Sequence, residues 1–202
     1  ELDRMVGHAV RAVYLNAGAA DVYAETEDAT LRAALERLWA NMTGRQMYAS
    51  GGIGSRYQGE AFGADYELPN ARAYAETCAA IGSVMWNWRM LQATGDPRYA
   101  DTLERSLYNG FLSGVSLDGQ RYFYVNPLIV SPTAAAKKPE TARARSRRDP
   151  WKGCACCPPN IARLVASIHE YAWSVNDDTL FVHLYHSGTA TVSAAGDDVT
   201  FA

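Results

Sequence analysis

The chain has 202 residues, of which 48% are hydrophobic and 20% are charged, and its formal net charge at pH 7 is −3. This composition permits a buried core and excludes a disordered or low-complexity protein. The small negative charge gives no reason to expect nucleic acid, and no apolar run approaches the roughly 20 residues that span a bilayer. We therefore expect a globular protein whose partners include neither nucleic acid nor membrane.

Both ends of the sequence suggest that it belongs to a longer protein. The chain opens with Glu1 rather than methionine, residues 2–8 read as a helix already under way, and residues 199–202 stop inside a strand-like run. We therefore expect a piece of a longer protein, in which a targeting signal upstream of Glu1 would not be visible.

Two helices and a long loop are predicted in the first 70 residues. Apolar side chains recur at helical spacing over residues 4–24 and again over residues 28–42. Residues 48–70 are rich in glycine and have neither a helical nor a strand period. Because loops of this length inside compact domains are usually functional, this loop is a candidate for part of a site.

Three further helices are predicted after the loop. One covers residues 77–94, a second starts at Pro97 and stops near Gly114, and a third starts at Pro158 and reaches about Trp173. Between the last two lie a strand-like run over residues 121–125 and a polar insertion over residues 132–150. The basic cluster at 143–148 in this insertion is interpreted as a solvated loop.

The hydrophobic period changes from helical to two after residue 176. Short strand-like runs follow over residues 180–185, 189–192 and 199–201. Helices followed by a series of short strands predict a mainly α fold with a β C-terminal part, in which a helical domain is joined to the beginning of an all-β domain.

All four cysteines lie in two short motifs. Cys78 ends Glu-Thr-Cys at 76–78, and the other three lie in Cys-Ala-Cys-Cys-Pro-Pro-Asn at 154–160. The adjacent Cys156 and Cys157 would form a poor disulfide but a good pair of thiolate ligands, and they precede the helix predicted at Pro158, whose N-terminus favours thiolate. With Cys78 and Glu76 they make four donors of the kind that tetrahedral Zn²⁺ takes.

Three interpretations of this cysteine cluster remain open from the residues alone. In a catalytic metal centre, Glu76 and Cys78 can reach one ion if Thr77 is the N-cap, since residues two apart within a regular helix point to different sides. A structural zinc site, and with it a non-catalytic binding module, would instead use all four cysteines. A thiol-redox protein would use Cys156 and Cys157 without metal.

The long loop adds carboxylates among aromatic side chains. Its acids are Glu60, Asp65 and Glu67, interleaved with Tyr57, Phe62 and Tyr66. A carboxylic acid with a raised pKa and rings that stack on a sugar are the groups that glycoside hydrolysis uses. The alternative for each acid is a solvated loop charge.

Several motifs in order along the chain resemble glycoside hydrolase family 127, the β-L-arabinofuranosidases. They are Gly-Gly-Ile-Gly-Ser at 51–55, Gly-Glu-Ala-Phe at 59–62, Tyr-Glu-Leu-Pro-Asn at 66–70, Ala-Tyr-Ala-Glu-Thr-Cys-Ala at 73–79, Asn-Gly at 109–110 and the cysteine motif at 154–160. The resemblance covers roughly residues 1–192. It implies the second half of an (α/α)₆ catalytic barrel over residues 1–175 and the first strands of a β-sandwich over residues 176–202.

The resemblance also implies a role for individual residues. The zinc ligands fall on Glu76, Cys78, Cys156 and Cys157, the nucleophile on Cys156 and the general acid/base on Glu60, while His8 and Tyr124 match substrate-binding positions. The implied reaction is retaining hydrolysis that releases terminal β-L-arabinofuranose or a related sugar. The family's other pocket histidines lie upstream of Glu1, so we expect little activity from this piece alone.

The expected partner is therefore a carbohydrate, an arabinofuranosyl glycan, and the expected cofactor is Zn²⁺. Reduced thiols that hold metal suit a reducing compartment, so we expect a cytoplasmic protein. The sequence leaves homo-oligomerisation open.

Overall fold

The computed structural model describes residues 2–129, 147–176, 179–194 and 197–201, which form two compact units over residues 1–160 and 161–202. Residues 130–146 lie outside the described residues. They include most of the predicted polar insertion at 132–150 and the first four residues, 143–146, of its basic cluster. Among the described residues, no helix is both long enough and apolar enough to cross a membrane.

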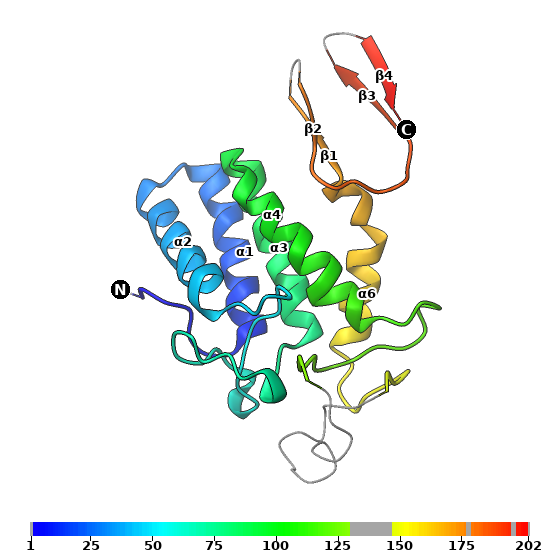
Figure 1. The fold of residues 1–202 in the computed structure, drawn as a ribbon. Helices are drawn as coiled ribbons and strands as arrows, with labels where there is room; N and C mark the ends of the chain where they lie inside the picture. Colours follow the sequence, from blue (N-terminus) through cyan, green and yellow to red (C-terminus); the bar gives the residue numbers. More distant parts are fainter. Residues whose placement is uncertain (1, 130–146, 177–178, 195–196, 202) are drawn as a thin grey trace. The chain divides into compact units, whose positions relative to one another are not determined.

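Four helices form the core of the first unit (Figure 1). They are α1 (Ala9–Thr26), α2 (Ala29–Asn41), α3 (Thr77–Thr94) and α4 (Pro97–Arg105). The central helix is α3, which packs against α1 and against α4 and is buried along most of its length, with Ile81, Trp86 and Met90 fully buried. A helix that is apolar on all sides is stable only when other elements enclose it. Because α3 is enclosed in this way, the position of its N-terminus within the first unit is fixed.

Local signals explain where these helices begin and end. Asp28 caps α2 by accepting hydrogen bonds from the backbone N–H groups of Thr30 (2.7 Å) and Leu31 (3.2 Å). Gly95, with φ 69°, ends α3 in the left-handed conformation, and Pro97 occupies the first turn of α4. The first helix begins at Ala9, five residues later than predicted, because Gly7 adopts φ 75° and interrupts the helical path.

The helix predicted from Pro97 to Gly114 changes its winding partway along. After α4 the chain forms a π-helical segment, Ser106–Phe111, and then a 3₁₀ turn, Leu112–Gly114. The glycine-rich loop approaches the backbone at this point: a Cβ atom on Gly51 would lie 2.9 Å from the Ser106 backbone N, and one on Gly110 would lie 3.3 Å from the Gly51 carbonyl carbon. Glycine at both positions therefore allows the loop to pack directly on the helix.

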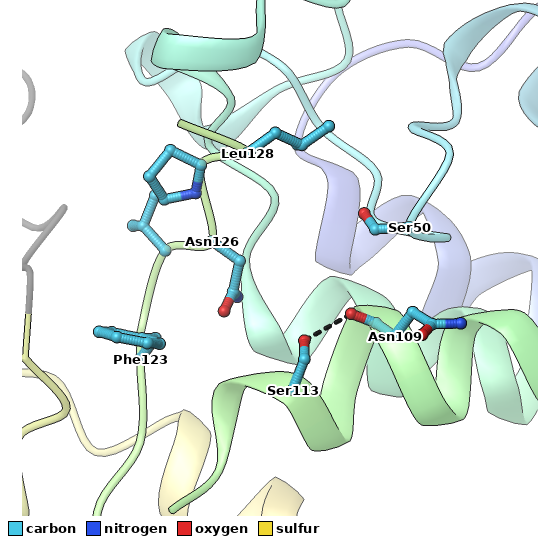
Figure 2. Close-up of a pocket in the computed structure, with 8 residues that line it drawn as sticks. Ser50, Asn109, Ser113, Phe123, Asn126 and Leu128 are labelled. Atoms are coloured by element: carbon cyan, nitrogen blue, oxygen red, sulfur yellow. Dashed lines mark hydrogen bonds between the residues drawn. The ribbon is translucent and has the colours of Figure 1, made fainter. Parts of the chain in front are cut away.

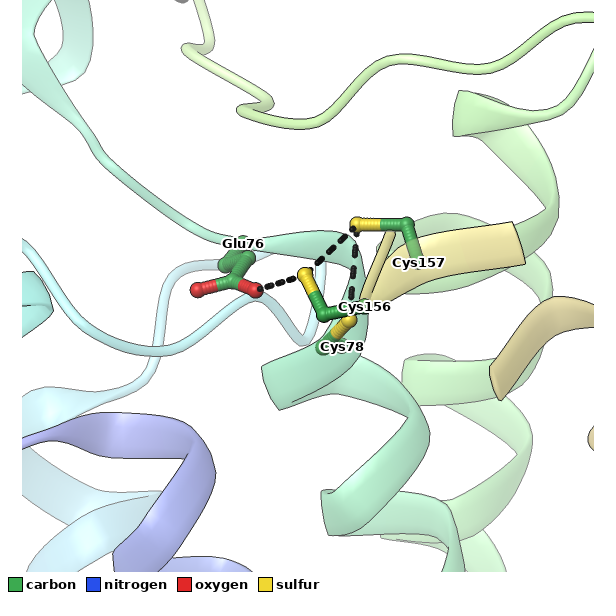
Figure 3. A group of neighbouring side chains, drawn as sticks. All are labelled: Glu76, Cys78, Cys156 and Cys157. Carbon is green, nitrogen blue, oxygen red and sulfur yellow. Dashed lines mark hydrogen bonds between the residues drawn. The ribbon is translucent and has the colours of Figure 1, made fainter. Parts of the chain in front are cut away.

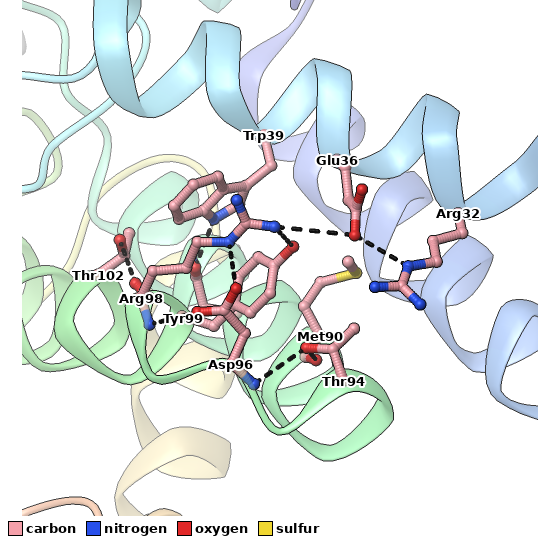
Figure 4. Close-up of polar contacts among 10 residues, drawn as sticks. Arg32, Glu36, Trp39, Met90, Thr94, Asp96, Arg98, Tyr99 and Thr102 are labelled. Carbon is pink, nitrogen blue, oxygen red and sulfur yellow. Dashed lines mark hydrogen bonds and ion pairs between the residues drawn. The ribbon is translucent and has the colours of Figure 1, made fainter.

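A polar and aromatic cluster joins α2 to α4 on the outside of the first unit (Figure 4). The Arg98 guanidinium carbon lies 5.0 Å from the ring centre of Trp39 and 4.9 Å from that of Tyr99, and an Arg98 nitrogen lies 3.0 Å from an Asp96 carboxylate oxygen. The indole N–H of Trp39 also donates to the Asn87 side-chain oxygen at 2.7 Å, and this bond links α2 to α3. These contacts hold α2 and α4 against the central helix.

The run at 121–125 does not form a strand, contrary to the prediction. Tyr122 pairs singly with Val115 and with Asp149, whereas Val125 pairs with Glu76. Because the partners lie on different segments, no continuous ladder can form. The arrangement nevertheless places the carbonyl of Tyr124 3.1 Å from the backbone N of Thr77, at the start of α3.

The second unit contains the predicted β structure. Helix α6 (Cys157–Ala166) begins within the residue range of the first unit and ends within that of the second. It ends earlier than the predicted residue 173, and a 3₁₀ turn, Ile168–Tyr171, follows it. Strand β1 (Trp173–Val175) pairs antiparallel with β2 (Leu180–Val182), and β3 (Ala190–Ala194) pairs antiparallel with β4 (Asp197–Phe201). The predicted fold class, mainly α with a β C-terminal part, is confirmed. The domain boundary at 175/176 stays a prediction.

Replacing Gly51 by alanine should destabilise the first unit by about 2–4 kcal/mol, because the new methyl group meets backbone atoms and φ is 80°. Gly95→Ala is the matched control, since it also has a positive φ but no heavy atom within 4 Å of the added Cβ, and it should cost only about 1 kcal/mol. Urea unfolding of both variants measures the difference, and equal losses would contradict the close-packing argument.

Candidate metal centre and active site

The N-terminus of α3 carries two of the predicted ligands. Glu76 is the N-cap residue and Thr77 the first helical residue, one position earlier than the predicted cap at Thr77. Ala75 has φ 41°, an uncommon backbone conformation for a residue other than glycine, and turns the chain sharply into the helix. Because Glu76 has extended backbone angles, its side chain and that of Cys78 face the same centre.

The two cysteine motifs meet at this point (Figure 3). The Sγ atoms of Cys78 and Cys157 lie 3.3 Å apart, and those of Cys156 and Cys157 lie 3.8 Å apart. Cys156 Sγ also lies 3.5 Å from Oε1 of Glu76. All four cysteines are free, since a disulfide needs sulfurs about 2.05 Å apart. The residues predicted as ligands are therefore brought together, and each offers one atom within 4.8 Å of all the others.

The donor set fits a metal ion. Two thiolates bound to one tetrahedral Zn²⁺ at about 2.3 Å would be about 3.8 Å apart, close to the separations observed here. Oε2 of Glu76 is buried and has no hydrogen-bond partner among the described residues, so that it is available to a cation. Cys154 is exposed and does not belong to this group, which does not favour the site of four cysteines.

The electrostatics of the group concentrate negative charge on Cys156. Hydrogen bonds from the thiols of Cys157 and then Cys78 lower the pKa of Cys156, and the Tyr124 hydroxyl acts in the same direction. The pKa of Cys157 is raised, chiefly because its thiol donates to Cys156. Burial raises the pKa of Glu76 to about 8, and the nearby charges of Cys156 and Glu60 add to this effect.

Exposure distinguishes Cys156 from the other two thiols of the group. Cys78 and Cys157 are fully buried and Glu76 is 2% exposed, whereas Cys156 is half-buried. A molecule approaching the centre can therefore reach the sulfur of Cys156 but not the other two. The same sulfur has the lowered pKa, which is the combination required of a nucleophile.

Glu60 lies beside this centre at the tip of a short hairpin. Arg56 and Ala61 close the hairpin with two backbone hydrogen bonds (3.0 and 3.1 Å), and Gly59 and Glu60 both have positive φ, 71° and 51°. Oε2 of Glu60 lies 3.1 Å from Nε2 of His8, and each of these two residues offers an atom within 4.8 Å of a Glu76 oxygen. Glu76 thus belongs both to the cysteine group and to a group formed with His8 and Glu60. Strained backbone at such a residue is common in functional sites.

Two tyrosines lie near the cysteine group. The Tyr124 hydroxyl oxygen lies 3.2 Å from Cys156 Sγ, and burial raises the pKa of Tyr124. Tyr122 was not predicted. Its hydroxyl is buried without a partner among the described residues, and its pKa is raised to about 12, first by burial and then by the cysteine charges. The signal was the Tyr-Phe-Tyr alternation, since residues two apart in an extended segment face the same side.

The other two acids of the loop are structural. Asp65 accepts hydrogen bonds from the side chains of Asn41 (3.0 Å) and Arg45 (2.8 Å). Glu67 accepts two bonds from the Arg56 guanidinium, at 2.7 and 2.5 Å, which hold the pKa of Glu67 down at about 2. Among the three loop carboxylates considered from the sequence, Glu60 is the one that faces the cysteine centre.

A cavity of about 180 Å³ lies away from these residues (Figure 2). Its wall includes Ser50 from the glycine-rich loop, Asn109 and Ser113 from the helical segments after α4, and Phe123 and Asn126. The Ser113 hydroxyl donates to the Asn109 carbonyl at 2.5 Å. None of the predicted site residues lines this cavity. Of the Asn-Gly motif at 109–110, Asn109 lines the cavity and Gly110 allows the close approach of the glycine-rich loop.

A single family model matches most of the chain. Residues 1–170 match the family model described as β-L-arabinofuranosidase, GH127 catalytic domain, and the chain belongs to this family.

Individual relatives support this assignment. The chain is 43% identical over 186 residues to a non-reducing end β-L-arabinofuranosidase of Bifidobacterium longum subsp. longum, which is 91% of this chain and 28% of the relative. The crystal structure of a GH127 β-L-arabinofuranosidase from Geobacillus stearothermophilus T6 is 47% identical, with a TM-score of 0.93 over 98% of this chain and 31% of that one. A solved GH127 β-arabinofuranosidase is 45% identical with a TM-score of 0.89, over 98% of this chain and 29% of that one. The chain therefore spans about a third or less of these relatives.

Glu67→Gln should lower the free energy of unfolding by about 0.5–1 kcal/mol at pH 7, since the pair with Arg56 is partly exposed. The pKa of Glu67 is lower in the folded state, so its contribution is fully present above about pH 4.5 and is lost as the pH falls toward about 2. Urea unfolding at both ends of this range tests the prediction. Glu25→Gln, an exposed change on α1, controls for net charge, and a pH-independent difference would contradict the argument.

Proposed function

We propose that this chain supplies the nucleophile, the general acid/base and the metal ligands of a retaining glycoside hydrolase that releases terminal β-L-arabinofuranose. The observation that carries the proposal is the position of Cys156, a half-buried thiol of lowered pKa beside Tyr124 and Glu76. The names of the relatives supply the sugar. The activity itself is proposed for the longer protein, because this chain spans under a third of the curated relative.

We propose Zn²⁺ as the metal, held by Glu76, Cys78, Cys156 and Cys157. Three sulfurs and one carboxylate oxygen are donors that zinc accepts in a four-coordinate site, whereas magnesium and calcium prefer oxygen alone. When bound, zinc would keep its cysteine ligands deprotonated. It would also offset the cost of burying Glu76, which is 2% exposed.

Cys156 and Glu60 would carry out the two steps of the reaction. The Cys156 thiolate attacks the anomeric carbon as Glu60 gives its proton to the leaving oxygen, so that the glycosidic bond breaks and a thioglycosyl bond forms. Glu60, now a carboxylate, takes a proton from water. The resulting oxygen nucleophile attacks the same carbon, which releases the sugar and restores the thiolate. Because two displacements occur at one carbon, the configuration is retained.

Nearby side chains would support these steps. His8 Nε2, 3.1 Å from Glu60 Oε2, would orient the acid and contact the sugar, and the Tyr124 hydroxyl, 3.2 Å from Cys156 Sγ, would position the thiolate. We propose these roles for His8 and Tyr124. We also propose that residues 1–175 form half of an (α/α)₆ barrel, that residues 176–202 begin a β-sandwich, and that the protein is cytoplasmic.

Cys156→Ser in the full-length enzyme should reduce kcat by at least about a thousandfold, because a serine hydroxyl ionises far less readily than a thiol. Cys154→Ser, a change of an exposed thiol two positions away, should retain most of the activity. Hydrolysis of an aryl β-L-arabinofuranoside measures both variants. Full activity in metal-loaded Cys156→Ser enzyme would refute the thiolate mechanism.

Metal analysis of the enzyme purified without chelator should find about one equivalent of zinc per chain. Cys78→Ser should remove most of it, since Cys78 Sγ lies within the ligand group, whereas Cys154→Ser should leave it bound. Loss of zinc in the Cys154 variant would instead favour the structural site of four cysteines. Absence of stoichiometric zinc from the unmodified enzyme would favour the redox interpretation.

A further inference from the structure

Asn160, the last residue of the cysteine motif, has no task in the mechanism proposed above. It lies in the first turn of α6, three residues after Cys157. Residues three apart on a helix project from the same face, so the Asn160 side chain lies on the face that carries Cys157. The Sγ atom of Cys157 is 3.3 Å from that of Cys78 (Figure 3). The amide of Asn160 is therefore placed next to the two buried thiols of the ligand group.

A tyrosine from α1 fixes the orientation of this amide. The Tyr14 hydroxyl donates to Oδ1 of Asn160 at 3.0 Å, so that the amide nitrogen points to the other side. The pKa of Cys78 is raised, chiefly by its hydrogen bond with Cys156, while a hydrogen bond with the Asn160 side chain acts in the opposite direction. A bond that favours the charged thiolate is one that the sulfur accepts, so the amide N–H of Asn160 donates to Cys78.

Close packing of α1 on α3 brings Tyr14 into reach of Asn160. A Cβ atom on Gly82 would lie 3.2 Å from Cε2 of Tyr14 and 2.5 Å from Cγ2 of Val13. Because Gly82 lies one turn after Cys78 in α3, the ring of Tyr14 packs against this helix just beyond the ligand. Three helices, α1, α6 and α3, thus contribute one residue each to the series Tyr14, Asn160 and Cys78.

The charge of the ligand group explains why a donor is needed at Cys78. Three thiolates and the Glu76 carboxylate exceed the charge of one Zn²⁺, so the loaded centre stays negative. Cys78 is fully buried, and water cannot reach its sulfur to compensate. Hydrogen bonds to a charged acceptor are stronger than those to a neutral one. The Tyr124 hydroxyl supplies such a bond at Cys156, and the Asn160 amide supplies one at Cys78.

We propose that Asn160 is a positioning residue of the metal centre. Held by Tyr14, its amide donates to the sulfur of Cys78 and keeps that sulfur in place as a thiolate ligand. The inference rests on the proposed function, since it concerns the metal proposed there. It assigns the last residue of the cysteine motif to the support of a ligand on another helix, and it assigns Tyr14 to the support of Asn160.

The test is a double-mutant cycle in the full-length enzyme, with zinc affinity measured by competition against a chromophoric chelator. Asn160→Leu keeps most of the side-chain volume but removes the amide, and it should weaken zinc binding about 10- to 100-fold, the usual loss when the partner of a metal ligand is removed. Tyr14→Phe should weaken it about three- to tenfold, because the amide loses its orientation but not its donor. In the Asn160→Leu background, Tyr14→Phe should have no further effect.

Cobalt-substituted enzyme supplies a readout that a loss of packing alone would not move. A hydrogen bond stabilises the electrons of a thiolate sulfur, so its removal should shift the sulfur-to-cobalt charge-transfer band to longer wavelength in Asn160→Leu and, to a smaller extent, in Tyr14→Phe. The matched control is Tyr23→Phe, which removes a hydroxyl on the same helix that accepts from Arg32 (3.5 Å) and lies outside the ligand group. It should leave both the zinc affinity and the band unchanged.

Unchanged affinity and an unchanged band in Asn160→Leu would overturn the proposal, as would additive effects of the two changes or an equal effect of the control. If Asn160→Leu does not fold, the affinity and band of Tyr14→Phe, compared with those of Tyr23→Phe, decide the question. Neither measurement uses a glycoside, so the predicted result supports the role of Asn160 even if the enzyme does not hydrolyse arabinofuranosides. Failure of the unmodified enzyme to bind zinc or cobalt would refute the proposed metal centre and, with it, this role.

Discussion

Burial of ionisable groups at one helix end is the constraint on which the site depends. Glu76 and two of its three cysteine neighbours are at most 2% exposed, and the pKa of Glu76 rises to about 8 because its charge is desolvated and lies near Cys156 and Glu60. Such a group is costly to assemble unless a cation neutralises it. The central position of α3, the contact of Tyr124 with Thr77 and the turn at Ala75 hold its members together despite that cost.

Close packing and local backbone strain in the long loop hold Glu60 near the cysteine centre. Glycine at 51 lets the loop lie against the backbone of Ser106, and the Arg56–Glu67 pair fixes the hairpin that follows. With its ends fixed in this way, the hairpin can hold Glu60 at φ 51° beside His8. The turn thereby places the Glu60 carboxylate near Glu76 of the cysteine centre, and the residues before it form part of the wall of a polar cavity.

Three chemically similar thiols differ in exposure and in pKa because their surroundings differ. Cys78 and Cys157 are enclosed and act as donors toward Cys156, which alone among the three is reachable and carries the lowered pKa. Cys154, which Ala155 separates from Cys156, is exposed and lies outside the ligand group. Spacing along the chain could not make this distinction, since it depends on which side chains pack over each sulfur.

The sequence by itself determined the helical segments, the change to short strands, the cysteine motifs and the identity of the loop acids, because periodicity, capping residues and metal-ligand chemistry are local properties. It could not decide that residues 121–125 pair singly instead of forming a strand, or that α4 passes into a π-helical segment beneath Gly51, since both depend on distant segments. Residue types alone also left Glu60 equivalent to Asp65 and Glu67, and it was the motif resemblance that pointed to Glu60. The tertiary structure supplies the physical distinction, because it brings arginines to Asp65 and Glu67 and places Glu60 beside His8 and Glu76.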